Sequence, residues 1–271
     1  MHRLTFVRTA ALVICLSAMG MATAAAQTTQ NKPFEPQVGQ SGKDVVWVPT
    51  PDPLVEKMLD MAKVTPSDFL MDLGSGDGKT VIAAAKRGVR AMGIEFNPDM
   101  VTLSQQRARD AGVTNMATFQ RADLFETDLS KATVITMFLL PDINLKLRPK
   151  ILDLRPGTRI VSNSFTMGEW EEDQSERVTE NCTSWCTALL WIVPAKVGGR
   201  WAVGNETLTL EQTFQMVSGS LGSTPITGGR LNGTEITFVA GNRTFKGTVA
   251  GNAITGAITG GAGGTFSATR Q

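Results

Sequence analysis

Between Pro51 and about residue 196, two patterns of apolar residues alternate along the chain. One is a short continuous run of strand length, and the other is a stripe of apolar residues at helical spacing. The first helical stripe comprises Leu54, Val55, Met58, Leu59 and Ala62. Thr50 is the expected N-cap of this helix and Pro51 its first residue. Strand-like apolar runs are then expected at 69–73, 89–95, 116–121, 134–140 and 158–162.

Helical segments fill the intervals between these runs, at 79–87, 97–111 and 142–154. Asn97 followed by Pro98 is typical of a helix start, and Gly112 of a helix end. Strands that alternate with helices through short turns predict an α/β fold with a doubly wound sheet. The runs at 177–181 and 187–193 have no helix between them, which predicts an antiparallel hairpin that closes the sheet.

The pattern changes near Val197, where apolar and polar residues begin to alternate with period two. From Gly219 to Gln271 there are 13 glycines and five charged residues in 53 positions. Asn-Gly and Gly-Asn pairs separate the alternating runs at the spacing of an antiparallel meander. We expect residues 197–271 to form a small all-β domain of about six short strands, as a sandwich or an open barrel.

The N-terminus has the layout of a secretory signal peptide at residues 1–26, with basic Arg3 and Arg8, an apolar stretch and small residues before Gln27. An uncleaved membrane anchor is the alternative. Residues 27–43 are polar and lack a period, which predicts a flexible leader before a domain at 44–196. We therefore expect an exported, periplasmic protein.

Two absences restrict the chemistry, because the 271 residues include no Tyr and one His, which is His2. A Ser-His-Asp system, a histidine base and a His-ligated metal site are thereby excluded from a mature protein, and no metal is expected. The formal net charge of +1 becomes −1 without the signal peptide, so no basic field favours nucleic acid. Cys182 and Cys186 could bridge in an oxidising compartment or remain free thiols.

A glycine-rich turn follows the run at 69–73 and reads Asp72-Leu73-Gly74-Ser75-Gly76-Asp77-Gly78. Such a turn lets the backbone approach a ligand at the start of the next helix. Glu95 ends the next strand, where nucleoside-binding folds place a ribose-binding carboxylate. The glycine spacing departs from the NAD fingerprint at Lys79, and Asp72 and Asp77 would repel a pyrophosphate, so S-adenosylmethionine is favoured.

These motifs resemble those of class I S-adenosylmethionine-dependent methyltransferases. DLGSGDGK, GIEFNP, RADLF and the run ITMFLLPDINLKLRPK, together with the upstream VWVPTPDPLVEKML, are similar to the mitochondrial protein-lysine methyltransferases of the FAM173 group. The resemblance covers about residues 44–196 and implies a Rossmann-like seven-stranded sheet, to which the β domain is an addition. It also implies transfer of a methyl group to a protein lysine.

The resemblance places the methionine end of the cofactor at the glycine turn, the ribose at Glu95 and the adenine at Asp123. The predicted cofactor-binding residues are Asp72, Gly74, Ser75, Gly76, Gly78, Glu95, Asn97, Asp123 and Leu124. Leu139, Leu140 and Pro141 are expected to border the transferred methyl group, in place of the Asn/Asp-Pro-Pro motif that other members use for planar amines.

Asp142 and Glu169 are the candidate catalytic carboxylates that would orient the acceptor amine, although Asp142 also suits a helix cap and Glu169 an acidic surface loop. Three other functions stay open at this point. They are a small-molecule methyltransferase, a cofactor-binding scaffold with the β domain as its interaction surface, and an NAD-linked oxidoreductase.

Overall fold

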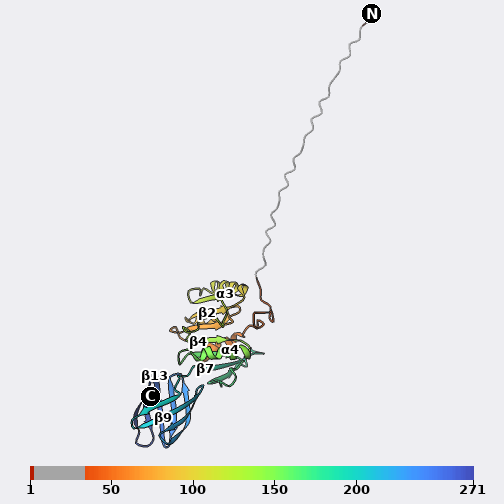
Figure 1. Cartoon of the computed structure of the whole chain (residues 1–271). Helices are drawn as coiled ribbons and strands as arrows, with labels where there is room; N and C mark the ends of the chain where they lie inside the picture. Colours follow the sequence, from red (N-terminus) through yellow and green to blue (C-terminus); the bar gives the residue numbers. More distant parts are fainter. Residues whose placement is uncertain (3–33) are drawn as a thin grey trace. The chain divides into compact units, whose positions relative to one another are not determined.

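A computed structural model of the chain describes residues 1–2 and 34–271 (Figure 1). The predicted signal peptide at 1–26 and the first part of the predicted leader therefore lie outside the described residues, apart from Met1 and His2. No helix in the described part of the chain is long and apolar enough to cross a membrane.

Seven strands of the described chain form one sheet, in the order β3-β2-β1-β4-β5-β7-β6 (Figure 1). Their bounds are β1 Phe69–Leu73, β2 Arg90–Glu95, β3 Ala117–Arg121, β4 Val134–Met137, β5 Arg159–Asn163, β6 Gln174–Arg177 and β7 Thr187–Ile192. β1 to β5 pair in parallel, whereas β7 pairs antiparallel with both β5 and β6. The predicted α/β sheet and its closing hairpin are confirmed, although the first hairpin strand lies a few residues before the expected 177–181.

Helices cover both faces of this sheet. They are α1 Asp52–Met61, α2 Lys79–Lys86, α3 Pro98–Asp110 and α4 Pro141–Leu152. Successive strand residues point to opposite faces, so Leu70 joins the core beneath α1, α2 and α3, while Met71 and Leu73 join the core beneath α4. The alternation of helix and strand in the sequence thus becomes two apolar layers on one sheet.

The two predicted helix caps have different outcomes. The side chain of Asn97 accepts hydrogen bonds from the backbone N–H groups of Asp99 and Met100, as predicted for the start of α3. The predicted cap at Thr50 is wrong, because Pro51 occupies the N-cap position of α1 and makes no side-chain cap. Thr50 instead uses its hydroxyl to accept a hydrogen bond of 3.4 Å from the Asn163 amide, beside the end of β5.

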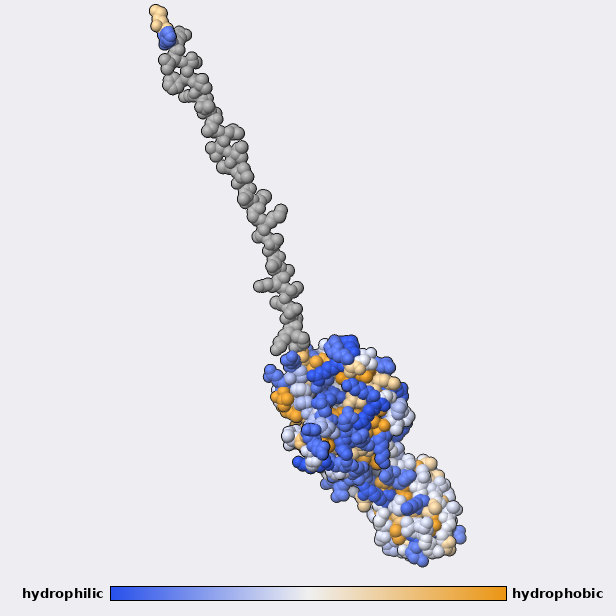
Figure 2. All heavy atoms as spheres, turned by 180° about the vertical axis from the view of Figure 1, so that it is seen from behind, coloured by the Kyte–Doolittle hydropathy of each residue, from blue (hydrophilic) through white to orange (hydrophobic). Residues whose placement is uncertain are grey.

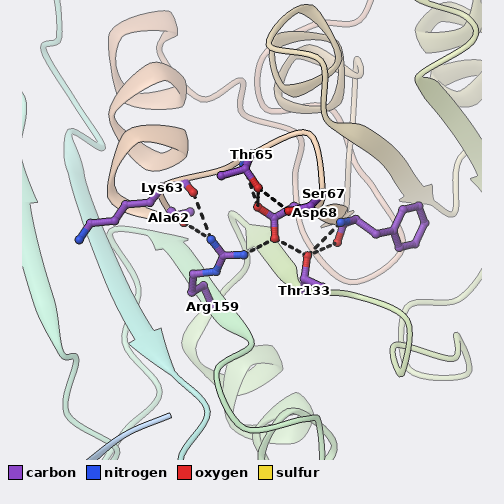
Figure 3. Close-up of polar contacts among 8 residues, drawn as sticks. Ala62, Lys63, Thr65, Ser67, Asp68, Thr133 and Arg159 are labelled. Atoms are coloured by element: carbon purple, nitrogen blue, oxygen red, sulfur yellow. Dashed lines mark hydrogen bonds and ion pairs between the residues drawn. The ribbon is translucent and has the colours of Figure 1, made fainter. Parts of the chain in front are cut away.

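A polar cluster joins three strands at the amino edge of the sheet (Figure 3). The carboxylate of Asp68, before β1, accepts hydrogen bonds from the Thr133 hydroxyl at 2.7 Å and the Thr65 backbone N–H at 2.8 Å, and pairs with Arg159 of β5. Arg159 also donates to the carbonyl of Ala62 at 2.6 Å, after α1. Burial would raise the pKa of Asp68, but these hydrogen bonds and the arginine charge hold it below its usual value.

The C-terminal strands form a closed barrel, which corrects the expected sandwich or open barrel of about six strands. Eight antiparallel strands close it: β8 Gly199–Val203, β9 Glu206–Thr213, β10 Met216–Leu221, β11 Thr224–Asn232, β12 Glu235–Ala240, β13 Arg243–Ala250, β14 Ala253–Thr259 and β15 Gly264–Arg270. Phe238 stacks on Phe245 with ring centroids 4.7 Å apart, and Phe266 meets both rings, so side chains fill the interior. Figure 2 shows a pale outer surface, as the few charged residues of this region predict.

Glycines inside the strands explain how so few residues close a barrel. A Cβ on Gly219 would lie 1.9 Å from the Thr209 carbonyl oxygen, and a Cβ on Gly229 would lie 2.1 Å from the Val217 carbonyl oxygen. The pairing of β10 with β11 is irregular between these glycines. Glycine at such bulges lets neighbouring backbones approach and the sheet bend, which a count of alternating runs does not reveal.

Candidate cofactor-binding site

A pocket with about 1050 Å³ of empty space up to its open mouth lies at the carboxyl ends of β1, β2 and β4. The carboxyl ends of parallel strands are where ligands bind in open α/β sheets. Residues 39–47 fold over this edge, because the backbone of Trp47 exchanges hydrogen bonds of 2.9 Å with Gly39 and Gln40. Gln40 and Lys43 line the pocket, so the predicted flexible leader does not extend to these positions.

The glycine turn after β1 forms one wall. Gly74 and Gly76 have φ angles of 72° and 52°, which favour glycine, and both line the pocket. A Cβ on Gly76 would lie 2.7 Å from the indole nitrogen of Trp47. Gly78 is absent from the described pocket lining, and its missing side chain leaves room for the ring of Phe119 instead. The structure therefore shows a packing role for Gly78, and its contact with the cofactor stays a prediction.

Glu95 is held at the end of β2 by two backbone N–H groups. Its Oε2 accepts from Gly76 at 2.9 Å and its Oε1 accepts from Asn97 at 2.8 Å. These bonds join the glycine turn after β1 to the start of α3. Glu95 and Asn97 both line the pocket, which brings together two of the residues that the sequence predicted to bind the cofactor.

The segment of the glycine turn carries two carboxylates, Asp72 and Asp77, and a positive charge neutralises only one of them. Asp72 is buried and accepts a hydrogen bond of 2.6 Å from the Thr136 hydroxyl. Burial, with added repulsion from Asp77 and Glu95, raises the pKa of Asp72 to about 7 despite that bond. Asp77 pairs with Arg107, so only part of the acidic charge predicted beside the turn is free to act on a ligand.

Ser75 lies between these acids and has a buried hydroxyl with no hydrogen-bond partner among the described residues. A Cβ on Gly93 would approach that hydroxyl within 2.5 Å, so glycine at position 93 makes room for it. A buried hydroxyl that lines a pocket without a partner suits a ligand that offers one. The wall of glycine backbone, carboxylates and this hydroxyl fits a cationic nucleoside without phosphate.

Asp123 and Leu124 follow β3 and line the other side of the pocket. Asp123 accepts a hydrogen bond of 2.9 Å from the Phe125 backbone N–H and pairs with Lys43. The bond to Lys43 lowers the pKa of the Asp123 carboxyl. The Lys43 ammonium also lies 4.9 Å from the ring centroid of Phe96. Sequence reasoning missed Lys43, because it lies in a non-periodic segment outside the quoted motifs. Trp47 belongs to the run VWVPTPDPLVEKML, although it was not among the predicted site residues.

The residues predicted to bind the acceptor are more dispersed. Leu139 is buried and lines the pocket, but Leu140 is 45% exposed and neither it nor Pro141 or Asp142 is part of the described lining. Pro141 and Asp142 form the exposed first turn of α4.

Glu169 is exposed in a turn between Met167 and Trp170. This turn packs on the middle of α4, since a Cβ on Gly168 would meet Leu145 within 2.7 Å. The structure therefore does not bring Asp142 and Glu169 together at the pocket, and their predicted catalytic roles have no geometric support.

The side chains of this chain that could bind a metal ion are those of the cysteine pair and the acidic residues. The structure joins Cys182 and Cys186 in a disulfide between β6 and β7. Among the described residues, no group of three or more His, Cys, Asp or Glu side chains could hold a metal ion.

Comparisons with known proteins agree with this geometry. A family profile described as ANTKMT methyltransferase domain matches residues 72–174. A protein-lysine N-methyltransferase of Saccharolobus islandicus is 40% identical over 139 residues, which span 50% of this chain and 86% of the relative. The adenine nucleotide translocase lysine N-methyltransferase of Mus musculus is 36% identical over 119 residues, and the match spans 43% of this chain and about half, 52%, of that relative.

A solved structure extends the comparison to the cofactor. The RNA methyltransferase of Salinibacter ruber in complex with S-adenosyl-L-homocysteine is 45% identical, with a TM-score of 0.52, over 55% of this chain and 96% of that one. The predicted enzyme class and the predicted cofactor, S-adenosylmethionine, are confirmed. The chain belongs to the family of S-adenosylmethionine-dependent methyltransferases that includes the protein-lysine N-methyltransferase of Saccharolobus islandicus.

Proposed function

We propose that this methyltransferase acts on the ε-amino group of lysine in a protein. The observation that supports this proposal is the lining of the pocket after β4, where Phe138 and Leu139 are both apolar. At this position the chain has no Asn/Asp-Pro-Pro segment that could hold a planar amine. An apolar lining suits the methylene stem of a lysine. The names of the archaeal and mouse relatives support the same acceptor.

In this proposal, different residues of the pocket bind different parts of the cofactor. Glu95, already fixed by two N–H groups, has lone pairs left for the ribose hydroxyls, and Asp123 accepts from the adenine amine with Leu124 against the ring. Asp72 and the Ser75 hydroxyl lie at the methionine end, where a carboxylate attracts the ammonium group.

S-adenosylmethionine supplies an electrophilic methyl group with its own leaving group. The chain then has to position an unprotonated amine and exclude water, which Phe138, Leu139 and the segment at 39–47 do by enclosing the pocket. With no Tyr in the chain and His2 as its one His, we propose that the lysine loses its proton to solvent before it enters.

The Salinibacter ruber structure favours a second candidate, because that relative is described as an RNA methyltransferase. The near-neutral net charge and the absence of a planar-amine motif argue against nucleic acid as the acceptor.

We also propose that the protein is exported to the periplasm. The support is the N-terminal sequence pattern and the Cys182–Cys186 disulfide, since disulfides persist in oxidising compartments. We propose no stable membrane insertion after cleavage. Cell fractionation tests the export, and the mass of the N-terminal peptide of the purified protein tests the cleavage. A cytosolic protein that begins at Met1 would contradict both.

The acceptor is tested with S-adenosylmethionine that carries a tritiated methyl group, offered with envelope protein and with RNA in separate reactions. We expect label on protein, retained after nuclease treatment and recovered as methylated lysine after hydrolysis. Label on RNA, or on neither, contradicts the proposal.

The matched variants are Glu95→Ala in the pocket and Glu211→Ala on an exposed position of β9. Glu95→Ala removes the ribose acceptor, so cofactor affinity measured by calorimetry should fall by about 100-fold or more, which corresponds to about 3 kcal/mol for a charged hydrogen bond. Glu211→Ala should bind as the wild type does. Equal affinities in all three proteins would remove Glu95 from the site.

A further inference from the structure

Three aromatic side chains meet beside the cofactor pocket, from parts of the chain that are far apart in sequence. Phe138 follows β4, Phe165 follows β5 and Trp185 precedes β7. Because β7 runs antiparallel to β5, its beginning lies at the same edge of the sheet as the ends of β4 and β5. The ring centroids lie 5.9 Å apart for Phe138 and Phe165, 5.8 Å for Phe138 and Trp185, and 5.2 Å for Phe165 and Trp185.

This aromatic trio, Phe138, Phe165 and Trp185, reaches from the pocket to the surface. Phe138 lines the pocket and is half-buried, whereas the Trp185 side chain is 44% exposed. A cofactor enclosed by the pocket would leave this side for a second reactant. The trio therefore extends the apolar lining of the pocket, formed after β4 by Phe138 and Leu139, towards the surface.

The trio is held in place by features that packing alone does not require. Trp185 has a φ of 56°, a left-handed conformation that is rare for a bulky side chain. The Cys182–Cys186 disulfide closes the short loop that carries it. The carbonyl of Phe165 accepts hydrogen bonds from the Ser162 hydroxyl at 2.7 Å and the Asn144 amide at 3.2 Å. Strain of this kind at an exposed residue points to a ligand contact.

We propose that the aromatic trio binds the acceptor lysine side chain, with its methylene stem along the rings and its ammonium or methylammonium head over a ring face. Aromatic faces attract alkylammonium groups, and methylated ammonium groups above all, because they combine apolar surface with positive charge. The inference rests on the proposed lysine acceptor and names the residues that recognise it. The disulfide acts by holding Trp185 against the two phenylalanines.

The first test measures binding directly. Protein loaded with S-adenosyl-L-homocysteine is titrated with n-butyltrimethylammonium, which mimics the end of a trimethylated lysine, in a ligand-observed magnetic resonance experiment. Trp185→Ala should weaken binding of this probe about five- to thirtyfold, as the loss of a partly desolvated cation–π contact predicts. Trp185→Phe keeps a ring and should stay within about twofold of the wild type.

The second test uses a synthetic peptide with one lysine as methyl acceptor. Trp185→Ala should raise the KM for this peptide by a similar factor with little change in kcat, and the double variant Cys182→Ser, Cys186→Ser should raise it less. Met216→Ala, at an exposed apolar residue of the barrel strand β10, is the matched control and should change neither constant. The affinity for S-adenosyl-L-homocysteine should be the same in all variants.

The outcomes separate this site from the proposed function. Methyl transfer to the peptide with equal KM values for the wild type and Trp185→Ala overturns the aromatic site and leaves the lysine acceptor intact. A loss of S-adenosyl-L-homocysteine affinity that parallels the loss of probe binding also overturns it, because the ring then serves the cofactor. Probe binding that depends on Trp185, without transfer to any lysine, supports the site and overturns the proposed acceptor.

Discussion

At the scale of single residues, Asp72 has the most unusual environment in the pocket, because its carboxyl is buried next to two other acids and has one hydroxyl donor, Thr136. Its pKa of about 7 in the folded protein lies above the ordinary value of 3.8. Between these two values the unfolded chain has lost the proton while the folded chain keeps it. The free energy of unfolding therefore falls as the pH rises through this window and stays low above it.

Asp72→Asn removes this penalty, since the amide is neutral at every pH and its oxygen can still accept from Thr136. Without cofactor, we expect the variant to exceed the wild type in free energy of unfolding at pH 8, by about 1 to 3 kcal/mol. Near pH 4 the two proteins should be alike. Urea denaturation at both pH values is the measurement, and a variant that is less stable than the wild type at pH 8 would contradict the assignment.

The sequence identified the pocket residues that belong to recognisable motifs. It did not identify those that reach the pocket only because the chain folds back on itself. Asp72 and Glu95 end apolar runs, so their place at the sheet edge follows from the pattern, and the structure puts both in the pocket. Lys43 and Trp47 reach the pocket through a non-periodic segment whose course is set by three backbone hydrogen bonds. The exposure of Asp142 could not be predicted, because the sequence does not show which side of α4 its first turn presents to the pocket.

At the scale of elements, the cluster around Asp68 fixes the amino edge of β1, β4 and β5, opposite the pocket (Figure 3). Asp68→Ala leaves the Arg159 guanidinium without its carboxylate in a mostly buried position. We expect the free energy of unfolding at pH 7 to fall by about 3 kcal/mol, as for other buried pairs that lose one partner. Cofactor affinity, measured by calorimetry on the folded variant, should stay as in the wild type.

The pH dependence of this cluster has the opposite sign to that of Asp72. The pKa of Asp68 is lowered in the folded protein, so its stabilising contribution is present above the ordinary value of 3.8 and is lost as the pH falls through the folded value. The stability difference between wild type and Asp68→Ala should therefore shrink below about pH 4. A difference that is constant from pH 7 to pH 3 would show that the charge of Asp68 has no part in it.

The order of elements was predictable from hydrophobic periodicity, because each strand of the sheet is a distinct apolar run with a helix or a hairpin after it. The convergence of the aromatic trio was not predictable, since Trp185 lies in a polar loop and meets Phe138 only because β7 is inserted beside β5. The closure of the barrel was also hidden, as it depends on glycines such as Gly219 that permit close backbone contact rather than on an apolar pattern.

At the scale of the whole described molecule, polar and aromatic contacts join the barrel to the sheet domain. Phe214, between β9 and β10, stacks on Trp170 with ring centroids 6.0 Å apart. Arg230 of β11 pairs with the mostly buried Asp173 at 2.6 Å, the Gln215 amide donates to the Glu171 carbonyl at 2.8 Å, and the Ala195 N–H donates to the Gly233 carbonyl at 2.8 Å. Asp173 also accepts from the backbone N–H of Ile192 in β7. These contacts tie the barrel to the hairpin that carries the disulfide loop and Trp185.

The double variant Gln215→Ala, Arg230→Ala removes the Arg230–Asp173 ion pair and the Gln215–Glu171 hydrogen bond, and leaves Asp173 with one donor. We expect its free energy of unfolding to fall by about 2 to 4 kcal/mol, because the mostly buried Asp173 carboxylate loses its cation and the buried Gln215 side chain is lost with its hydrogen bond. Arg243→Ala is the matched control, since Arg243 forms an exposed ion pair of 3.7 Å with Glu206 within the barrel and should cost less than about 1 kcal/mol. Cofactor affinity should be unchanged in both, because none of these residues lines the pocket. If the double variant is as stable as the control, these two polar contacts do not stabilise the junction, and the Phe214–Trp170 stack and the backbone bond of Ala195 are what join the barrel to the sheet domain.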